Sequence, residues 1–261
     1  MLSLFLNATI VILILVTILW IWSIFLVNVS IVDIFWGIGF VVVNAIYFYL
    51  SGNSHPRNII LLVLVTLWGL RLAIYLGLRN YGKGEDFRYR EFRKKYGESR
   101  YWWISYFQTF LLQAGLMMII SLPLLGANYF TSTDGLHWID YLAIFIWTVG
   151  IIFEAGGDFQ LARFKGNPQN KDKVLDTGLW RYTRHPNYFG DSAVWWAYGL
   201  FCIAAGSYWP AIGSIVMTLL IIKVSGVALL EKSLSGKKPE YREYIRKTSP
   251  FFPWLPKKAG Q

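Results

Sequence analysis

Long apolar runs dominate this chain and limit what it can fold into. A helix that crosses a hydrocarbon core of roughly 30 Å needs about 20 mostly apolar residues. Seven runs suit that length, and they cover residues 2–27, 31–50, 58–78, 107–125, 138–161, 188–205 and 208–230. The sequence therefore predicts an all-α integral membrane bundle of seven transmembrane helices.

The composition excludes several other classes of protein. Charged residues make up 15% of the chain, against roughly 25% in ordinary soluble domains. A single cysteine, Cys202, rules out a disulfide framework and a cysteine-rich zinc site, and three histidines leave little for another metal centre. We expect no metal, no nucleic acid and no obligate protein partner.

The distribution of basic residues predicts the orientation. Of the 25 Lys and Arg, 22 fall in residues 79–100, 163–184 and 232–258, and the connections between them hold almost none. Because basic residues favour the cytoplasmic side, the N-terminus is expected outside and the C-terminus in the cytoplasm. No linker separates domains, so residues 1–261 form one multi-pass domain, in the inner membrane if the source is bacterial.

Ionisable residues within or beside the apolar runs are the first functional signal. A charge in hydrocarbon is costly, so such residues usually face the bundle interior. Most of them fall toward the cytoplasmic ends of their helices, which indicates a polar pocket open to the cytoplasm. Interhelical ion pairs or snorkelling side chains are the alternative. The set is Asp33, Arg71, Glu154, Asp158, Asp191, Lys223 and Glu231.

The stretch from Asp158 to Asp191 has the parts of a nucleotide site. Lys and Arg neutralise phosphates, acids accept ribose hydroxyls, aromatic rings stack on flat bases, and a helix starting at Pro186 favours anions at its N-terminus. A cationic loop lying on anionic lipid is the alternative. Besides the two acids, the predicted contacts are Lys165, Asn170, Lys173, Arg181, Tyr182, Arg184, His185, Asn187 and Tyr188.

The run Gly178-Leu-Trp-Arg-Tyr-Thr-Arg-His-Pro-Asn-Tyr-Phe-Gly-Asp191 resembles the DUF1295 group of the steroid 5-alpha-reductase superfamily. Residues 33–37, 68–76 and 84–90 extend the likeness over nearly the whole chain. The resemblance implies a membrane oxidoreductase that takes NADPH from the cytoplasmic side. Its substrate would be a lipophilic steroid-like or isoprenoid compound from the bilayer, with a carbon–carbon double bond conjugated to a carbonyl.

The resemblance also implies which residues bind the cofactor, mostly in the half from about residue 139 to 261. The aspartate before the cytosolic loop matches Asp158, and the position of an asparagine one turn earlier is Glu154 here. The other implied contacts are Lys165, Lys173, Asn187, Asp191, Glu231, Arg79 and Asn80.

The catalytic end matches the superfamily less well. Steroid reductases use a Gln-Glu pair and a tyrosine to polarise the substrate carbonyl, whereas this chain has Asp33 without the Gln, and Trp68 at the tyrosine position. Two candidates could replace this donor: Tyr75, two helical turns after Trp68 on the same face, and Arg71, one turn from Tyr75. We expect Asp33 and Tyr75 to be catalytic, and Trp36, Trp68 and Arg71 to contact the substrate.

Two other readings stay open. Isoprenylcysteine carboxyl methyltransferases also carry an Arg-His-Pro-x-Tyr run, and this chain has one at residues 184–188, but it lacks the second Glu of their Glu-Glu pair. A lipid-binding or scaffolding membrane protein is the non-enzymatic alternative.

Residues 81–101 have the spacing of an amphipathic helix that either lies on an anionic surface or covers the cofactor. The tail, residues 235–261, is expected to be an interfacial anchor.

Overall fold

The computed structural model of the chain describes residues 1–130, 135–171, 173–225 and 239–257. Within these ranges the regular structure is helical and contains no strand, which confirms the all-α prediction. The chain forms two compact units. Unit 1 comprises Met1–His137 with Phe201–Gly213, and unit 2 comprises Trp138–Leu200 with Ser214–Gln261.

Unit 1 opens with three long helices joined by short turns. They are α1 (Leu2–Leu26), α2 (Ile31–Ser51) and α3 (Pro56–Asn80). The turn after α2 is closed by Gly52 at φ 65°, and the N–H of Arg57 donates to Nδ1 of His55 to cap the start of α3. α2 and α3 lie close together where Gly37 faces Gly69, because a Cβ on Gly37 would lie 2.3 Å from the carbonyl oxygen of Gly69.

The next part of unit 1 differs from the sequence prediction in its boundaries. Instead of one amphipathic helix over residues 81–101, the chain forms α4 (Phe87–Tyr96) and breaks at Gly97, whose φ of 86° ends the helix. The following span begins at Glu98 rather than at residue 107 and runs to Ile120. It contains α5 (Glu98–Ser105), the π-helical turn η1 (Tyr106–Leu111) and α6 (Leu112–Ile120). Pro123 lies in the first turn of α7 (Leu122–Tyr129), just after this span ends.

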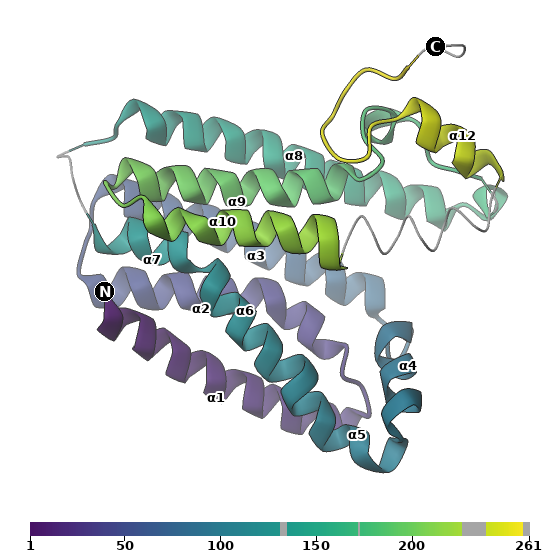
Figure 1. Cartoon of the computed structure of the whole chain (residues 1–261), viewed down its shortest axis with the longest axis horizontal. Coiled ribbons are helices and arrows are strands. Elements are labelled where there is room, and N and C mark those ends of the chain that lie inside the picture. Colours follow the sequence, from purple (N-terminus) through teal and green to yellow (C-terminus); the bar gives the residue numbers. More distant parts are fainter. Residues whose placement is uncertain (131–134, 172, 226–238, 258–261) are drawn as a thin grey trace. The chain divides into compact units, whose positions relative to one another are not determined.

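Unit 2 is built on α8 (Trp138–Gly166) and α9 (Pro186–Ala204). The last residues of α9, from Phe201, belong to unit 1. The two helices run side by side (Figure 1) because glycines bring their backbones together: a Cβ on Gly190 would lie 2.3 Å from the backbone nitrogen of Glu154. The remaining elements are η2 (Pro168–Asn170), η3 (Gly178–Arg181), η4 (Trp209–Ala211, in unit 1), α10 (Ile212–Leu219), η5 (Leu220–Ser225) and α12 (Pro239–Lys247).

Within the described residues, five helices are long and apolar enough to cross a membrane, which indicates a multi-pass membrane protein. They are Leu2–Leu26, Ile31–Ser51, Pro56–Asn80, Glu98–Ile120 and Trp138–Gly166. The sixth predicted span is a helix, α9, but it is not among these five. The seventh, residues 208–230, extends beyond the described residues. The count of seven and the orientation of the termini stay predictions.

Candidate functional site

A hydrogen bond between an acid and an amide joins α8 to the start of α9. Asn187 donates from Nδ2 to Oδ1 of Asp158 over 3.0 Å, although the two are 29 residues apart in sequence. Asp158 is 5% exposed. Gly157 makes the approach possible, because a Cβ there would lie 3.0 Å from the backbone nitrogen of Asn187. The carboxylate of Asp158 therefore sits beside the N-terminal turn of α9, where the helix dipole stabilises negative charge.

The other two acids predicted on these helices, Glu154 and Asp191, lie one helical turn from this hydrogen bond. Glu154 precedes Asp158 by one helical turn, and Asp191 follows Asn187 by one turn, so each pair shares a helix face. Glu154 is 3% exposed, and its backbone lies against Gly190 of α9. Four residues that the sequence singled out are thus brought together where α8 and α9 meet.

The basic loop, residues 167–185 between α8 and α9, folds back onto the C-terminal end of α8. Gly178 begins η3 with φ at 61°, and the next N–H, of Leu179, donates to Oε1 of Gln160 over 3.0 Å. The indole N–H of Trp180 donates to the carbonyl oxygen of Gly157 over 3.1 Å. These bonds hold residues 179 and 180 of the loop against Gly157 and Gln160, which lie one and two positions from Asp158.

A C-terminal strap, residues 248–254, holds the other side of this loop. The N–H of Arg184 donates to the carbonyl of Ser249, and the N–H of Trp254 donates to that of Tyr182, both over 2.9 Å. The hydroxyl of Thr183 donates to the carbonyl of Phe251 over 2.8 Å. This part of the tail therefore packs against residues 182–184. Its expected role as a membrane anchor stays a prediction.

Arg184 has a structural task that the sequence did not suggest. Its Nη1 donates to the backbone carbonyls of Ile245 and Thr248, at 2.9 and 2.7 Å, and the residue is 6% exposed. The guanidinium therefore ties the end of α12 to the start of α9. Its predicted contact with phosphate stays a prediction, and a loss of function on replacing Arg184 has a structural explanation.

Tyr244 of α12 is a further residue that the sequence analysis did not assign to the site. Its buried hydroxyl donates to the carbonyl of Trp180. Burial raises the pKa of this phenol, and neighbouring Tyr241 adds to the rise. The sequence signal for it is the pair of tyrosines in the tail, Tyr241 and Tyr244, whose spacing alone does not indicate a partner.

The remaining predicted contacts of the loop divide by exposure. His185 is buried and stacks on Tyr188, with ring centroids 5.6 Å apart. Asn170 donates from Nδ2 to the carbonyl of Phe164 and so closes the end of α8. The exposed members are Lys165, Lys173, Arg181 and Tyr182. Glu231 lies outside the described residues.

In unit 1, Asp33 has partners other than the predicted ones. Its carboxylate accepts hydrogen bonds from Nη2 of Arg88 and from the hydroxyl of Tyr89, each over 2.7 Å. Burial and the charge of Asp33 raise the pKa of Tyr89, so the phenol keeps its proton. The side chain of Asp33 is therefore held by two residues of α4. Its predicted catalytic role stays a prediction.

The other predicted substrate contacts lie on α2 and α3. Trp36 packs edge-on against Phe40, and Phe40 packs against the fully buried Trp68, with centroids 5.1 and 5.9 Å apart. The guanidinium carbon of Arg71 lies 5.4 Å from the ring centroid of Tyr75. Two further predicted cofactor residues end α3 in this unit: Arg79 is exposed, and its Nε donates to Oδ1 of Asn80 over 3.3 Å.

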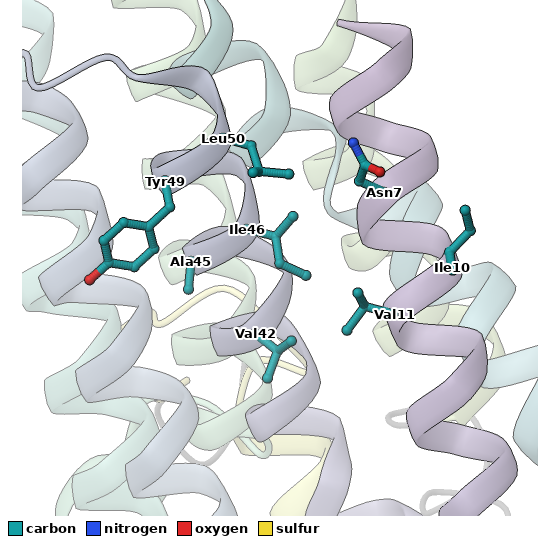
Figure 2. A pocket seen from close by; sticks show the side chains of 8 residues that line it. All are labelled: Asn7, Ile10, Val11, Val42, Ala45, Ile46, Tyr49 and Leu50. Atoms are coloured by element: carbon teal, nitrogen blue, oxygen red, sulfur yellow. The ribbon is translucent and has the colours of Figure 1, made fainter.

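An open groove of about 550 Å³ lies between α1 and α2 (Figure 2). Its lining is mostly apolar and comprises Asn7, Ile10, Val11, Val42, Ala45, Ile46, Tyr49 and Leu50. Val42 is nine residues after Asp33, or about 13 Å along the helix at the rise of an α-helix. The groove suits a hydrocarbon chain, but the predicted catalytic residues do not line it.

The fold and the site define an α-helical, multi-pass membrane protein with buried acids beside a cationic loop. The chain belongs to the DUF1295 family, described as proteins of unknown function, which matches residues 19–248. It is similar to the uncharacterized protein C594.04c of Schizosaccharomyces pombe, with 26% identity over 262 residues, 91% of this chain and 76% of that protein. No solved structure matches this chain.

Proposed function

We propose that this protein is a membrane oxidoreductase that uses NADPH to reduce a carbon–carbon double bond conjugated to a carbonyl in a steroid-like or isoprenoid substrate. The observation that carries the proposal is the hydrogen bond between the buried Asp158 and Asn187 at the start of α9. Both residues match cofactor-binding positions of the steroid 5-alpha-reductase superfamily, which our chain resembles in sequence.

The residues at this site suit a phosphate-bearing dinucleotide. Carboxylates such as Asp158 and Asp191 accept hydrogen bonds from ribose hydroxyls, and the exposed cations of the loop, Lys165, Lys173 and Arg181, would bind phosphates. Tyr182 offers an exposed ring for stacking. When bound, NADPH supplies a hydride.

The substrate end of the proposal rests on α3. The carboxylate of Asp33 already accepts hydrogen bonds from Arg88 and Tyr89. We therefore assign to Tyr75 the hydrogen bond that polarises the substrate carbonyl. Arg71 lies against the Tyr75 ring and adds positive charge that would stabilise an enolate as it develops, the kind of electrostatic stabilisation that often carries much of the rate. Trp36 and Trp68 would form the apolar wall for a substrate that enters from the bilayer.

A methyltransferase that uses S-adenosylmethionine is the second candidate. The observation that favours it is the packing of the tail, through Arg184 and Tyr244, onto the Arg-His-Pro run. Buried acids also suit the sulfonium cation. However, S-adenosylmethionine carries no phosphate, so this function leaves the exposed cations of the loop without a ligand.

Thermal unfolding of the full-length protein in detergent separates these functions. A ligand stabilises the folded state by RT ln(1 + [L]/Kd), about 2.7 kcal/mol at 100 times Kd. We expect NADPH to raise the Tm more than NADH, and S-adenosylmethionine to leave it unchanged. Asp158→Ala should abolish the shift, whereas Glu98→Gln, an exposed acid on α5, should retain it. A shift with S-adenosylmethionine alone would replace the reductase with the methyltransferase.

A further inference from the structure

The cations of α4 divide into two sets that do different things. On the inner face, Arg88 bridges Asp33 and Asp86 at 2.7 and 2.9 Å. Arg93 forms a fork on Glu85, with its Nε and Nη2 at 3.0 and 2.9 Å from the two carboxylate oxygens. The inner cations are therefore neutralised by carboxylates of unit 1.

The acids just before α4 fix the helix to the turn between α1 and α2. Oε1 of Glu85 accepts from the N–H of Val29 over 2.9 Å, and the N–H of Asp86 donates to Oγ of Ser30 over 3.0 Å. Tyr89, on the inner face, is 5% exposed. With the inner face held in this way, the opposite face of α4 is fixed toward the surroundings of unit 1.

The outward cations far outnumber the acids near them. Between residues 79 and 100, six Lys and Arg are exposed but only two acids, Glu91 and Glu98. Glu91 pairs with Lys94 over 3.0 Å, but both side chains are more than 60% exposed, and a pair so open to water neutralises little. Three of these cations, Arg90, Lys94 and Lys95, lie on α4. The other three, Arg79, Lys83 and Arg100, lie before or after it in the chain.

The position of α4 in the chain places this surface at the membrane boundary. α4 lies between the end of one candidate span, Pro56–Asn80, and the start of the next, Glu98–Ile120, and it runs across the direction of α1 and α2 (Figure 1). Exposed aromatic side chains lie at the start of α4 and on either side of it in the chain, a composition typical of the headgroup level of a bilayer. They are Tyr81, Phe87, Trp102 and Trp103, between 44% and 87% exposed.

We propose that the outer face of α4, centred on Arg90, Lys94 and Lys95, is a docking surface for anionic phospholipid headgroups. The phosphates meet the three cations while the neighbouring aromatic rings lie among the upper acyl chains. Because basic residues near an anionic membrane each add to the attraction, the surface selects anionic over zwitterionic lipid. This role is independent of the proposed reductase.

The test is lipid binding to the full-length protein in detergent, measured by native mass spectrometry with phosphatidylglycerol and with phosphatidylcholine. The triple variant Arg90→Gln, Lys94→Gln and Lys95→Gln should weaken phosphatidylglycerol binding by roughly 10-fold or more and leave phosphatidylcholine binding unchanged. Gln is a good helix former, and an unchanged Tm would verify folding. Binding to the wild type should also weaken with added salt.

A matched control removes the same number of exposed charges elsewhere, with Arg163→Gln, Lys171→Gln and Arg242→Gln in unit 2. This variant should keep the wild-type affinity for phosphatidylglycerol. Equal weakening in both variants would overturn the proposal, because net charge rather than α4 would then attract the lipid. Loss of the NADPH-induced Tm shift in the α4 variant, with lipid binding intact, would overturn it too and make α4 a cover for the cofactor.

Discussion

The amide of Asn187 meets the carboxylate of Asp158 at 3.0 Å, across the whole length of the basic loop. Replacing Asn187 by Ala removes a donor from a carboxylate that is 5% exposed. Loss of a hydrogen bond to a buried acceptor costs roughly 1–3 kcal/mol. We expect a lower Tm in detergent and weaker NADPH binding, measured by thermal unfolding with and without the cofactor. Asn7→Ala, an exposed amide on α1, should change neither, and an Asn187→Ala protein with wild-type behaviour would argue against the site.

This pair shows what the sequence could predict. Asp158 and Asn187 lie on either side of a charged loop, at the ends of two apolar runs. The pattern of hydrophobicity and charge therefore predicted that both belong to a polar site at these helix ends. Gln160, Thr183 and Tyr244 were missed because they bind backbone groups of the loop and strap. Tyr244 lies 64 residues from Trp180, and no periodicity indicates such a contact.

Asp33 shows where reasoning from single helices fails. Its partners, Arg88 and Tyr89, lie 55 and 56 residues further along the chain. They reach it because Gly82 and Gly84, at φ 71° and 70°, turn the chain after α3. Local patterns placed Asp33 in a polar environment correctly, but its ion pair depends on a turn whose direction the sequence does not reveal. The end of α4 at Gly97 was not predicted either, because it also depends on a local backbone turn.

Asp86 gives a pH-dependent prediction. Burial acts to raise the pKa of its carboxyl, but hydrogen bonds from Arg88 and its charge outweigh burial, so the pKa is lowered. The ionised group thus adds stability above its unfolded pKa of about 4 and loses it as the pH falls through the lower folded value. Asp86→Asn keeps a good N-cap without the charge. Its Tm should lie below that of the wild type at pH 7, and the difference should shrink below about pH 4.

The control for this titration is Glu91→Gln, which removes an exposed acid from the same helix. An exposed pair contributes roughly 0–1 kcal/mol, so this variant should follow the wild type from pH 7 to pH 3. A difference between Asp86→Asn and wild type that stays constant down to pH 3 would show that charge is not its cause.

The crossing of α2 and α3 gives a prediction with an internal control on the same helix pair. Alanine at Gly37 would place Cβ 2.3 Å from the backbone oxygen of Gly69, so the helices must separate. Overpacking of this kind typically costs about 1–3 kcal/mol. At Gly77 nothing lies within 4 Å of the added Cβ, and Ala gains roughly 0.5–1 kcal/mol in a helix interior. Gly37→Ala should lower the Tm and Gly77→Ala should not. Equal effects would contradict the close approach.

Tyr244→Phe tests whether the tail holds the site loop. The variant leaves the carbonyl of Trp180 without its phenol donor, at a cost of roughly 1–3 kcal/mol for a buried acceptor. Amide hydrogen exchange should accelerate at Arg184 and Trp254, whose N–H groups bond across strap and loop, because local opening becomes easier. Tyr141→Phe, an exposed tyrosine on α8, should leave both rates unchanged.

The raised pKa of Tyr244 adds a second signature. A phenol whose folded pKa exceeds its unfolded value of about 10 stabilises the fold fully below that pH, and this stability is lost as the pH rises further. The wild type should therefore lose Tm above about pH 10 more steeply than Tyr244→Phe, which has no phenol to ionise at this position. Parallel alkaline profiles, together with unchanged exchange at Arg184, would mean that the strap is held without this hydrogen bond.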